Sequence, residues 1–439
     1  MLSFFVPARF AAPARDGAPV AGAGEWRRGW PLVLAAMLGA GFGPGLFQNL
    51  SSLFLPGLER DFGWSRGQIA TMTAVALMAG VAAPWIGRVA DRRGVRPVIV
   101  ASMLILAVAH LALALTGPSQ WRFQALLFLL VLTMPGTSTL VYGKLIARAF
   151  VHHRGAALAI ATSGLAIATL FMPPVVGAAI AALGWRWGFV VLAGGASLVA
   201  LPLILLAIRR ADDLPTHPDP ASPAAQRVVV GVTAVEARRD PRFWRMIVGA
   251  VCINFATVGL VTQIVPLGIE RGIGAGDAAL LLTAFGTSQL AGRLLIGFAV
   301  DRYRPQRVAT LVALVSAAAF AAMAPGAPGL AAMLVLVFLA GLMNGAENDL
   351  LPFMLARLFG LRAFAEIYGS GIPFGLVGAG LGIMAFGRLH DWQGDYWPAL
   401  VLASGALAVA AWCFHSLTDR DLPAACAAAT PVAGTDDAA

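Results

Sequence analysis

The sequence predicts an all-α integral membrane protein with twelve transmembrane helices arranged as two pseudo-symmetric six-helix bundles. Hydrophobic residues make up 59% of the 439 residues and charged residues only 12%, with a mean hydropathy of +0.79. A soluble protein carries about 25% charged residues. Apolar stretches long enough to cross about 30 Å of hydrocarbon recur along the chain, and its two halves resemble each other. These three observations carry the prediction.

The apolar stretches define the expected elements. The longest polar interruption, residues 209–242, is rich in Pro, Asp and Arg and separates six stretches from six. We expect a cytoplasmic N-terminal tail at 1–28, a bundle at 29–207, a cytoplasmic central loop at 208–241, a bundle at 242–418 and a cytoplasmic C-terminal tail at 419–439. The expected spans are 30–56, 66–89, 96–116, 121–149, 155–182, 185–207, 243–268, 278–300, 306–325, 328–356, 363–387 and 395–416.

The distribution of arginine predicts the orientation. A net charge of +9 is compatible with nucleic-acid binding, but the basic residues cluster at the ends of apolar stretches on alternate loops. This positive-inside pattern predicts cytoplasmic termini and argues against a nucleic-acid partner. The N-terminal segment has no long apolar core and is interpreted as a tail rather than a signal peptide. Abundant alanine and arginine are typical of a GC-rich bacterial genome, so we expect the bacterial inner membrane. The expected outer loops carry only Arg60, Arg66, Arg122, Arg186, Arg271 and Arg388.

The two halves repeat at an offset of about 210 residues. GRVADRR from Gly87 recurs as GFAVDRY from Gly297, and GLER from Gly57 recurs as GIER from Gly268. Two parallel repeats place a substrate site near the middle of the membrane, between the halves.

Arg293 is the main candidate for substrate binding. It lies inside the apolar run TAFGTSQLAGRLLIGFAV, where a charge costs at least about 2.5–3.5 kcal/mol. Its repeat counterpart is Ala83, so the fold itself does not need a cation there. A buried guanidinium is suited to holding a carboxylate by two hydrogen bonds. Gln289 lies one turn earlier on the same helix face and is expected either to orient the guanidinium or to bind substrate.

Two carboxylates and a lysine in the apolar stretches are candidates for coupling and gating. Glu347 is expected to carry a proton, because burial disfavours an ionised carboxylate. The alternative for Glu347 is a fixed ion pair with Lys144 or Arg357. Asp349 is expected to have a structural or gating role. Lys144 either extends to the membrane interface or pairs with one of these carboxylates across the two halves.

Several motifs resemble those of known transporters. GRVADRRGVR, from Gly87 to Arg96, is similar to the loop signature of the major facilitator superfamily. FGWSRGQIA, FVHHRGAALAIATSGLA and the span 8 arginine resemble the group of monocarboxylate transporters and oxalate–formate antiporters. The chain departs from that group at Gln289, where mammalian members have an acidic residue, and in residues 363–387, which lack the antiporter's lysine.

The resemblance implies roles for further residues. Spans 1, 4 and 7 line the cavity of that fold, so Asn49, Tyr142 and Asn254 are expected to contact substrate. The signature loop holds the halves together on the cytoplasmic side when the site faces outward. That role is expected of Asp91, Arg92, Arg96, Asp301 and Arg302.

These features predict a secondary transporter that moves a small organic anion by alternating access, most simply a monocarboxylate together with a proton. Anion antiport, efflux of a drug-like compound and a non-transporting membrane sensor remain alternatives. The three cysteines show no paired spacing. We see no metal cluster, nucleophile triad or nucleotide loop, and therefore expect neither enzymatic activity nor a cofactor. The resemblance implies a monomer.

Overall fold

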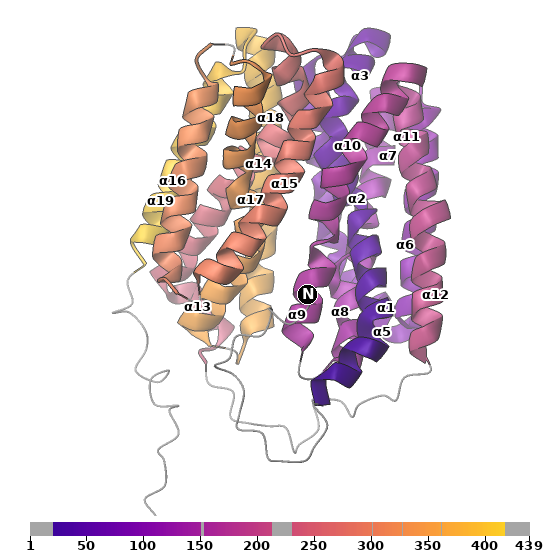
Figure 1. Ribbon diagram of the computed structural model, residues 1–439, viewed down its shortest axis with the longest axis vertical. Coiled ribbons are helices and arrows are strands. Elements are labelled where there is room, and N and C mark those ends of the chain that lie inside the picture. Colours follow the sequence, from indigo (N-terminus) through magenta and orange to yellow (C-terminus); the bar gives the residue numbers. More distant parts are fainter. Residues whose placement is uncertain are drawn as a thin grey trace, which may run out of the picture.

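The computed structural model describes residues 21–150, 153–212, 231–300, 302–326, 328–360 and 362–417. Its helices form two bundles that stand side by side, one from each half of the sequence (Figure 1). Apart from an isolated bridge between Gly231 and Gly360, these residues contain no β-structure. The predicted all-α fold is therefore confirmed.

The N-terminal bundle contains several broken helices. Its elements are α1 (Ala21–Gly41), α2 (Pro44–Leu50), η1 (Ser51–Leu53), α3 (Leu55–Phe62), α4 (Arg66–Ala76), η2 (Leu77–Ala82), α5 (Ala83–Arg93), α6 (Val95–Ala114), α7 (Gln120–Leu132), η3 (Met134–Thr137), α8 (Thr139–Ala149), α9 (Arg154–Thr162), α10 (Gly164–Leu183), α11 (Trp185–Gly194), η4 (Gly195–Ala200) and α12 (Leu201–Asp212).

The C-terminal bundle is built from longer helices. Its elements are α14 (Pro241–Glu270), α15 (Ala275–Ala299), α16 (Pro305–Met323), α17 (Leu330–Phe359), α18 (Phe364–Gln393) and α19 (Trp397–His415), preceded by the short helix α13 (Ala234–Arg239). Asp240 begins α14 by accepting a hydrogen bond from the backbone N–H of Arg242, which satisfies one of the unpaired donors at the helix start.

Ten helical stretches among the described residues are long and apolar enough to cross a membrane. A pair bent by 44°, Gly29–Gly41 with Pro44–Leu53, raises this number to eleven. The predicted span 66–89 is not among them, because it is divided into α4, η2 and α5. Pro84 lies in the first turn of α5. Proline is tolerated at that position because its missing N–H breaks no intrahelical bond there, so its presence is consistent with a new helix that begins at Ala83.

The predicted tail and central loop differ from the structure at their edges. Helix α1 begins at Ala21, within the segment 1–28 that was expected to be a tail. Helix α12 continues to Asp212, and α13 lies within the segment expected to be the central loop. The backbone N–H of Val232 donates to Phe359 of α17, so the end of the connection packs against the C-terminal bundle.

The most extensive contacts between the two bundles are those of α4 with α18 and of α10 with α15, and α14 also meets α2, η1 and α3. Helix α1 begins, and helix α19 ends, toward the bottom of the view in Figure 1. We call this the terminal end of the molecule. Helix α3 lies at the opposite end, which we call the distal end. Along the first contact, Ala70, Ala74 and Leu77 form a buried apolar cluster with Val258 and Ile383.

Close helix packing within the C-terminal bundle depends on glycine. A Cβ on Gly345 of α17 would collide with the backbone of Gln289 in α15. Overpacking of this kind costs about 1–3 kcal/mol, so we expect Gly345→Ala to lower the unfolding temperature of the purified protein. Gly405 of α19 is the matched control, because a Cβ there meets nothing within 4 Å. Equal unfolding temperatures for the two variants would contradict the packing.

Candidate functional site

A chain of neutral side chains connects the two bundles at mid-length. The Asn49 side-chain N–H group donates to Thr169 Oγ1 (2.9 Å) and, at 3.5 Å, to Gln289 Oε1. Gln289 Nε2 donates to Asn344 Oδ1 (2.7 Å), and Asn344 Nδ2 donates to Thr257 Oγ1 (2.9 Å). The five residues come from α2, α10, α15, α17 and α14. Buried polar groups need such partners, and here the partners lie in both halves of the chain.

Arg293 lies four residues after Gln289 on α15, which places it on the same helix face and nearer the terminal end. Its Nη1 donates to Thr162 Oγ1 of α9 (2.7 Å), and its Nε lies 3.9 Å from Asp349 Oδ2 of α17. The guanidinium therefore contacts both halves of the protein.

The Arg293 side chain is 14% exposed and that of Asp349 is 37% exposed. A separation of 3.9 Å is too long for a hydrogen bond. A guanidinium has five N–H donors, and the described residues occupy one of them with a hydrogen bond. Within the part of the chain that the structure describes, the other N–H groups of Arg293 have no hydrogen-bond acceptor and could be used by a bound anion.

Glu347 lies nearby on α17 and is 8% exposed. Its Oε1 accepts a hydrogen bond from Asn254 Nδ2 of α14 at 2.7 Å. Among the described residues Glu347 therefore bonds to a neutral amide and no ion pair with Arg357 is present, while the side chain of Lys144, the other expected partner, lies outside them. Tyr368 of α18 lies within electrostatic reach of Arg293, Glu347 and Asp349.

The structure brings most of the predicted site residues together, with two differences. The Gln289 amide bonds to Asn49 and Asn344, and no bond from it to the Arg293 guanidinium is present among the described residues. Tyr142 is 1% exposed within the N-terminal bundle, where its hydroxyl lies against Gly39 of α1. It is thus packed between two helices of one bundle rather than placed beside Arg293.

Sequence reasoning missed Thr162, Thr169, Thr257, Asn344 and Tyr368. Asn344 lies three residues before Glu347, close to one helical turn, and this spacing was the available signal. The threonines are isolated polar residues in apolar stretches and have no such signal. Only the packing of the helices identifies them.

The predicted cytoplasmic gating residues are only partly described. Arg92, Arg96 and Arg302 are exposed at the terminal end. Asp301 lies outside the described residues, as do the side-chain positions of Asp91 and Lys144.

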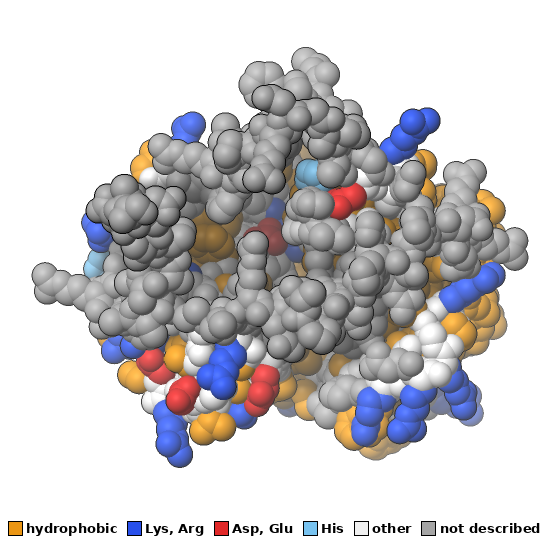
Figure 2. Space-filling model, turned by 90° about the horizontal axis from the view of Figure 1, so that it is seen from below, with side chains coloured by type: hydrophobic (Ala, Val, Ile, Leu, Met, Phe, Trp, Pro, Cys, Tyr) orange, Lys and Arg blue, Asp and Glu red, His pale blue; other side chains and the backbone are white. Residues whose placement is uncertain are grey.

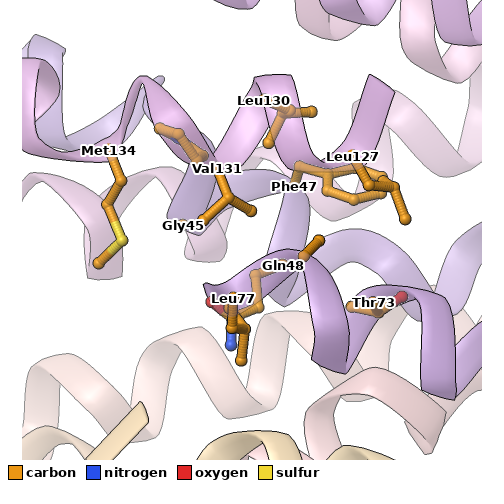
Figure 3. A pocket seen from close by; sticks show the side chains of 11 residues that line it. Gly45, Phe47, Gln48, Thr73, Leu77, Leu127, Leu130, Val131 and Met134 are labelled. Carbon is orange, nitrogen blue, oxygen red and sulfur yellow. The ribbon is translucent and has the colours of Figure 1, made fainter. Parts of the chain in front are cut away.

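The view of the terminal end in Figure 2 shows acidic and basic side chains set deep near its centre. A separate small pocket lies within the N-terminal bundle, between α2, α4, η2 and α7 (Figure 3). Gln48 and Thr73 are polar side chains of its lining, which is otherwise mostly apolar and contains no charged residue from the described part of the chain. A charged solute is therefore better matched by the Arg293 region.

Comparison with known families gives the protein its class. Residues 36–369 match the family model of the Major Facilitator Superfamily. The chain belongs to this superfamily. It is accordingly a membrane transporter of small substrates, not an enzyme.

Two curated relatives belong to the same class. The chain is 26% identical over 422 residues to monocarboxylate transporter 11 of Homo sapiens, covering 91% of this chain and 84% of the human protein. It is 23% identical over 293 residues to the MFS transporter asaE of Aspergillus flavus, covering 66% of this chain and 63% of that protein.

Solved structures confirm the fold. The nucleoside transporter NupG has a TM-score of 0.67 at 16% identity, covering 87% of this chain and 98% of NupG. A bacterial homologue of the human lysosomal transporter Spinster, in an inward-facing and unoccupied conformation, has a TM-score of 0.62 at 18% identity. The match covers 89% of this chain and 93% of that homologue. These likenesses support the two-bundle architecture that the repeat predicts.

Proposed function

We propose that this superfamily member carries a small organic anion, a monocarboxylate, together with a proton by alternating access. The observation that carries the proposal is the position of Arg293, whose guanidinium contacts both halves and keeps donors available. The similarity to monocarboxylate transporter 11 supports the same substrate class.

A cation at this depth is costly unless it serves a charged partner. The guanidinium can bind a carboxylate through two parallel N–H···O bonds, which gives both strength and orientation. In the structure Asp349 is the acidic residue nearest the Arg293 guanidinium, with Oδ2 3.9 Å from Nε. A substrate carboxylate would take its place on Arg293 and so reach residues from both bundles.

We propose Glu347 as the proton-coupling group. Burial penalises the ionised form of a carboxyl group, and the neutral Asn254 amide offers it no compensating charge. A proton carried on Glu347 would neutralise its carboxylate. The protein could then change between its outward-facing and inward-facing states without that buried negative charge.

We further propose that the protein lies in a bacterial inner membrane as a monomer, with cytoplasmic tails. The terminal end is then the cytoplasmic end. The excess of arginine in loops on that side supports this orientation.

Transport into proteoliposomes tests the proposal. Labelled lactate, pyruvate, acetate, oxalate and an aromatic acid would be supplied with and without an inward proton gradient. Gradient-driven uptake of a monocarboxylate is the expected result. Substrate exchange at a rate independent of the proton gradient would identify an antiporter. The absence of any carboxylate transport would leave efflux of a drug-like compound as the better hypothesis.

Asp349→Asn should strengthen substrate binding. The variant removes the charge that competes with the substrate for Arg293 while it preserves the side-chain shape. A partly exposed ion pair contributes at most about 1 kcal/mol, so we expect the apparent Kd to fall by up to about fivefold. Binding to the purified protein measured by calorimetry gives the value. Weaker binding by Asp349→Asn would show that Asp349 itself contacts the substrate.

A further inference from the structure

The repeated motif GLER/GIER contributes to a cluster at the distal end that the proposed substrate site does not use. Its glutamates are Glu59, within α3, and Glu270, the last residue of α14. They occupy the same position in the two copies of the motif. The pseudo-symmetry of the fold thus places one carboxylate from each half at the distal end.

One arginine binds both glutamates. Arg66 Nε donates to Glu59 Oε1 (2.7 Å), and Arg66 Nη1 donates to Glu270 Oε1 (2.5 Å). The guanidinium also donates to the Tyr396 hydroxyl (2.8 Å), and its carbon lies 5.4 Å from the centre of the Tyr396 ring. The Arg66 side chain is 15% exposed, so dissolved salt screens these ionic contacts only weakly.

A second layer from the C-terminal half supports this arginine. His390 Nε2 lies 2.8 Å from Glu270 Oε1 and 3.1 Å from Arg66 Nη1. The Tyr396 hydroxyl donates to Gln263 Oε1 (2.8 Å). Burial raises the pKa of Tyr396, which keeps the phenol protonated as that donor.

The arrangement is one-sided even though the glutamates are symmetric. At the offset of 211 residues that relates the two copies of the motif, the counterpart of Arg66 is Asp277, so only the N-terminal half supplies the cation. Neighbouring bonds also join the halves at the distal end. Ser65 Oγ donates to Asp391 Oδ2 (2.5 Å), and Arg388 Nη2 donates to Thr71 Oγ1 (3.1 Å).

The terminal end is different. In the part of the chain that the structure describes, the polar contact between the halves nearest that end is the bond from Arg293 to Thr162. Among the described residues, the charged contacts between the halves at the distal end are those of Arg66, Asp391 and Arg388. Alternating access requires that such an end open during each cycle.

We propose that Arg66 is the latch of the distal gate, and that separation of Arg66 from Glu270 opens the central site to the distal side. Glu59 keeps the guanidinium aligned from within its own half. The latch rests on the proposed alternating-access transport but does not depend on which substrate is carried.

Cysteine crosslinking across the gate tests the latch without any substrate. A Cβ on Gly380 of α18 lies 3.9 Å from the Cβ of Ala74 in α4, within the range that a disulfide spans. Ala74→Cys and Gly380→Cys would be combined in a protein whose cysteines at 252, 413 and 426 are replaced by alanine. The rate of crosslinking by copper phenanthroline, followed by mass spectrometry, then reports how often the distal end is closed.

Adding Arg66→Gln should slow crosslinking about tenfold, because a charge-assisted contact between the halves is lost. Arg60→Gln is the matched control from the same motif. Arg60 is 75% exposed and pairs with Asp61 of its own half, so its removal should leave the rate unchanged. An unchanged rate in Arg66→Gln would overturn the latch.

Variants of the two glutamates distinguish a latch between the halves from a structural role of Arg66 within one half. Glu270→Gln weakens the bond between halves and should slow crosslinking more than Glu59→Gln, which acts within one half. Equal effects of the two variants would contradict the proposal. Glu270→Gln also carries the test if Arg66→Gln does not fold.

The latch and the proposed function can fail separately. Slower crosslinking without any carboxylate transport would refute the substrate proposal and support the latch. Proton-driven uptake together with unchanged crosslinking in both Arg66→Gln and Glu270→Gln would refute the latch alone.

Discussion

Arg293→Gln should lower kcat/KM for carboxylate uptake at least about 100-fold, since two charge-assisted hydrogen bonds to the substrate are lost. Glutamine keeps a polar side chain of moderate length but has neither the charge nor the forked donor geometry. Initial rates of labelled uptake into proteoliposomes provide the measurement. Arg293→Lys should show an intermediate loss, because lysine preserves the charge without the fork.

Arg238→Gln is the control for this variant. Arg238 lies on α13, is 45% exposed and pairs with the exposed Glu366, so its loss should not change uptake. Normal carboxylate uptake by Arg293→Gln would show that the guanidinium has a structural role. The anion proposal would then have to be abandoned.

Glu347→Gln should separate proton coupling from substrate movement. Glutamine can still accept the hydrogen bond from Asn254, so the local structure should persist. It cannot take up or release a proton, and the stimulation of uptake by an inward proton gradient should therefore disappear. Exchange of labelled for unlabelled substrate should continue, because that half-cycle needs no net proton transfer.

The measurement for Glu347→Gln compares gradient-driven uptake with exchange in the same vesicles. Glu366→Gln is the matched control, since its carboxylate is 65% exposed on the protein surface and should not affect either rate. Gradient-driven uptake that survives in Glu347→Gln would assign the proton to another group. Loss of both activities would instead indicate that Glu347 contributes to substrate binding.

Most of the fold could be predicted from local patterns, with one clear limit. Apolar stretches of sufficient length predict helices that cross the membrane, and the structure contains them in most of the expected places. The stretch 66–89 is apolar but forms three short helices. The average hydropathy of a stretch does not predict where its backbone bends. The position of a bend depends on proline and on the neighbouring helices.

The candidate site was predictable to the extent that a residue type is unusual for its surroundings. Arg293 and Glu347 are conspicuous because charge in an apolar stretch is costly. Gln289 is also unusual, and its spacing suggested Arg293 as a partner, whereas its described hydrogen bonds go to Asn49 and Asn344. Spacing along one helix shows which residues share a face, while the residues on other helices compete for the same hydrogen bonds.

The latch illustrates the same division. The motif GLER/GIER was visible as a repeat, and Arg66 was visible as an arginine of an outer loop and as part of FGWSRGQIA. That Arg66 joins the two glutamates follows from the contact between α4 and α18 and from the meeting of α3 with α14.

The sequence by itself determined the membrane environment, the two-fold repeat, the superfamily and the unusual position of Arg293, because each depends on composition or on local order along the chain. The tertiary structure decided the partners: Asn49 with Gln289, Asn254 with Glu347, and Arg66 with Glu270. Helices pack through close contacts at small residues such as Gly286 and Gly345. Those contacts set the depth and rotation of each helix, and only then is it settled which polar groups meet.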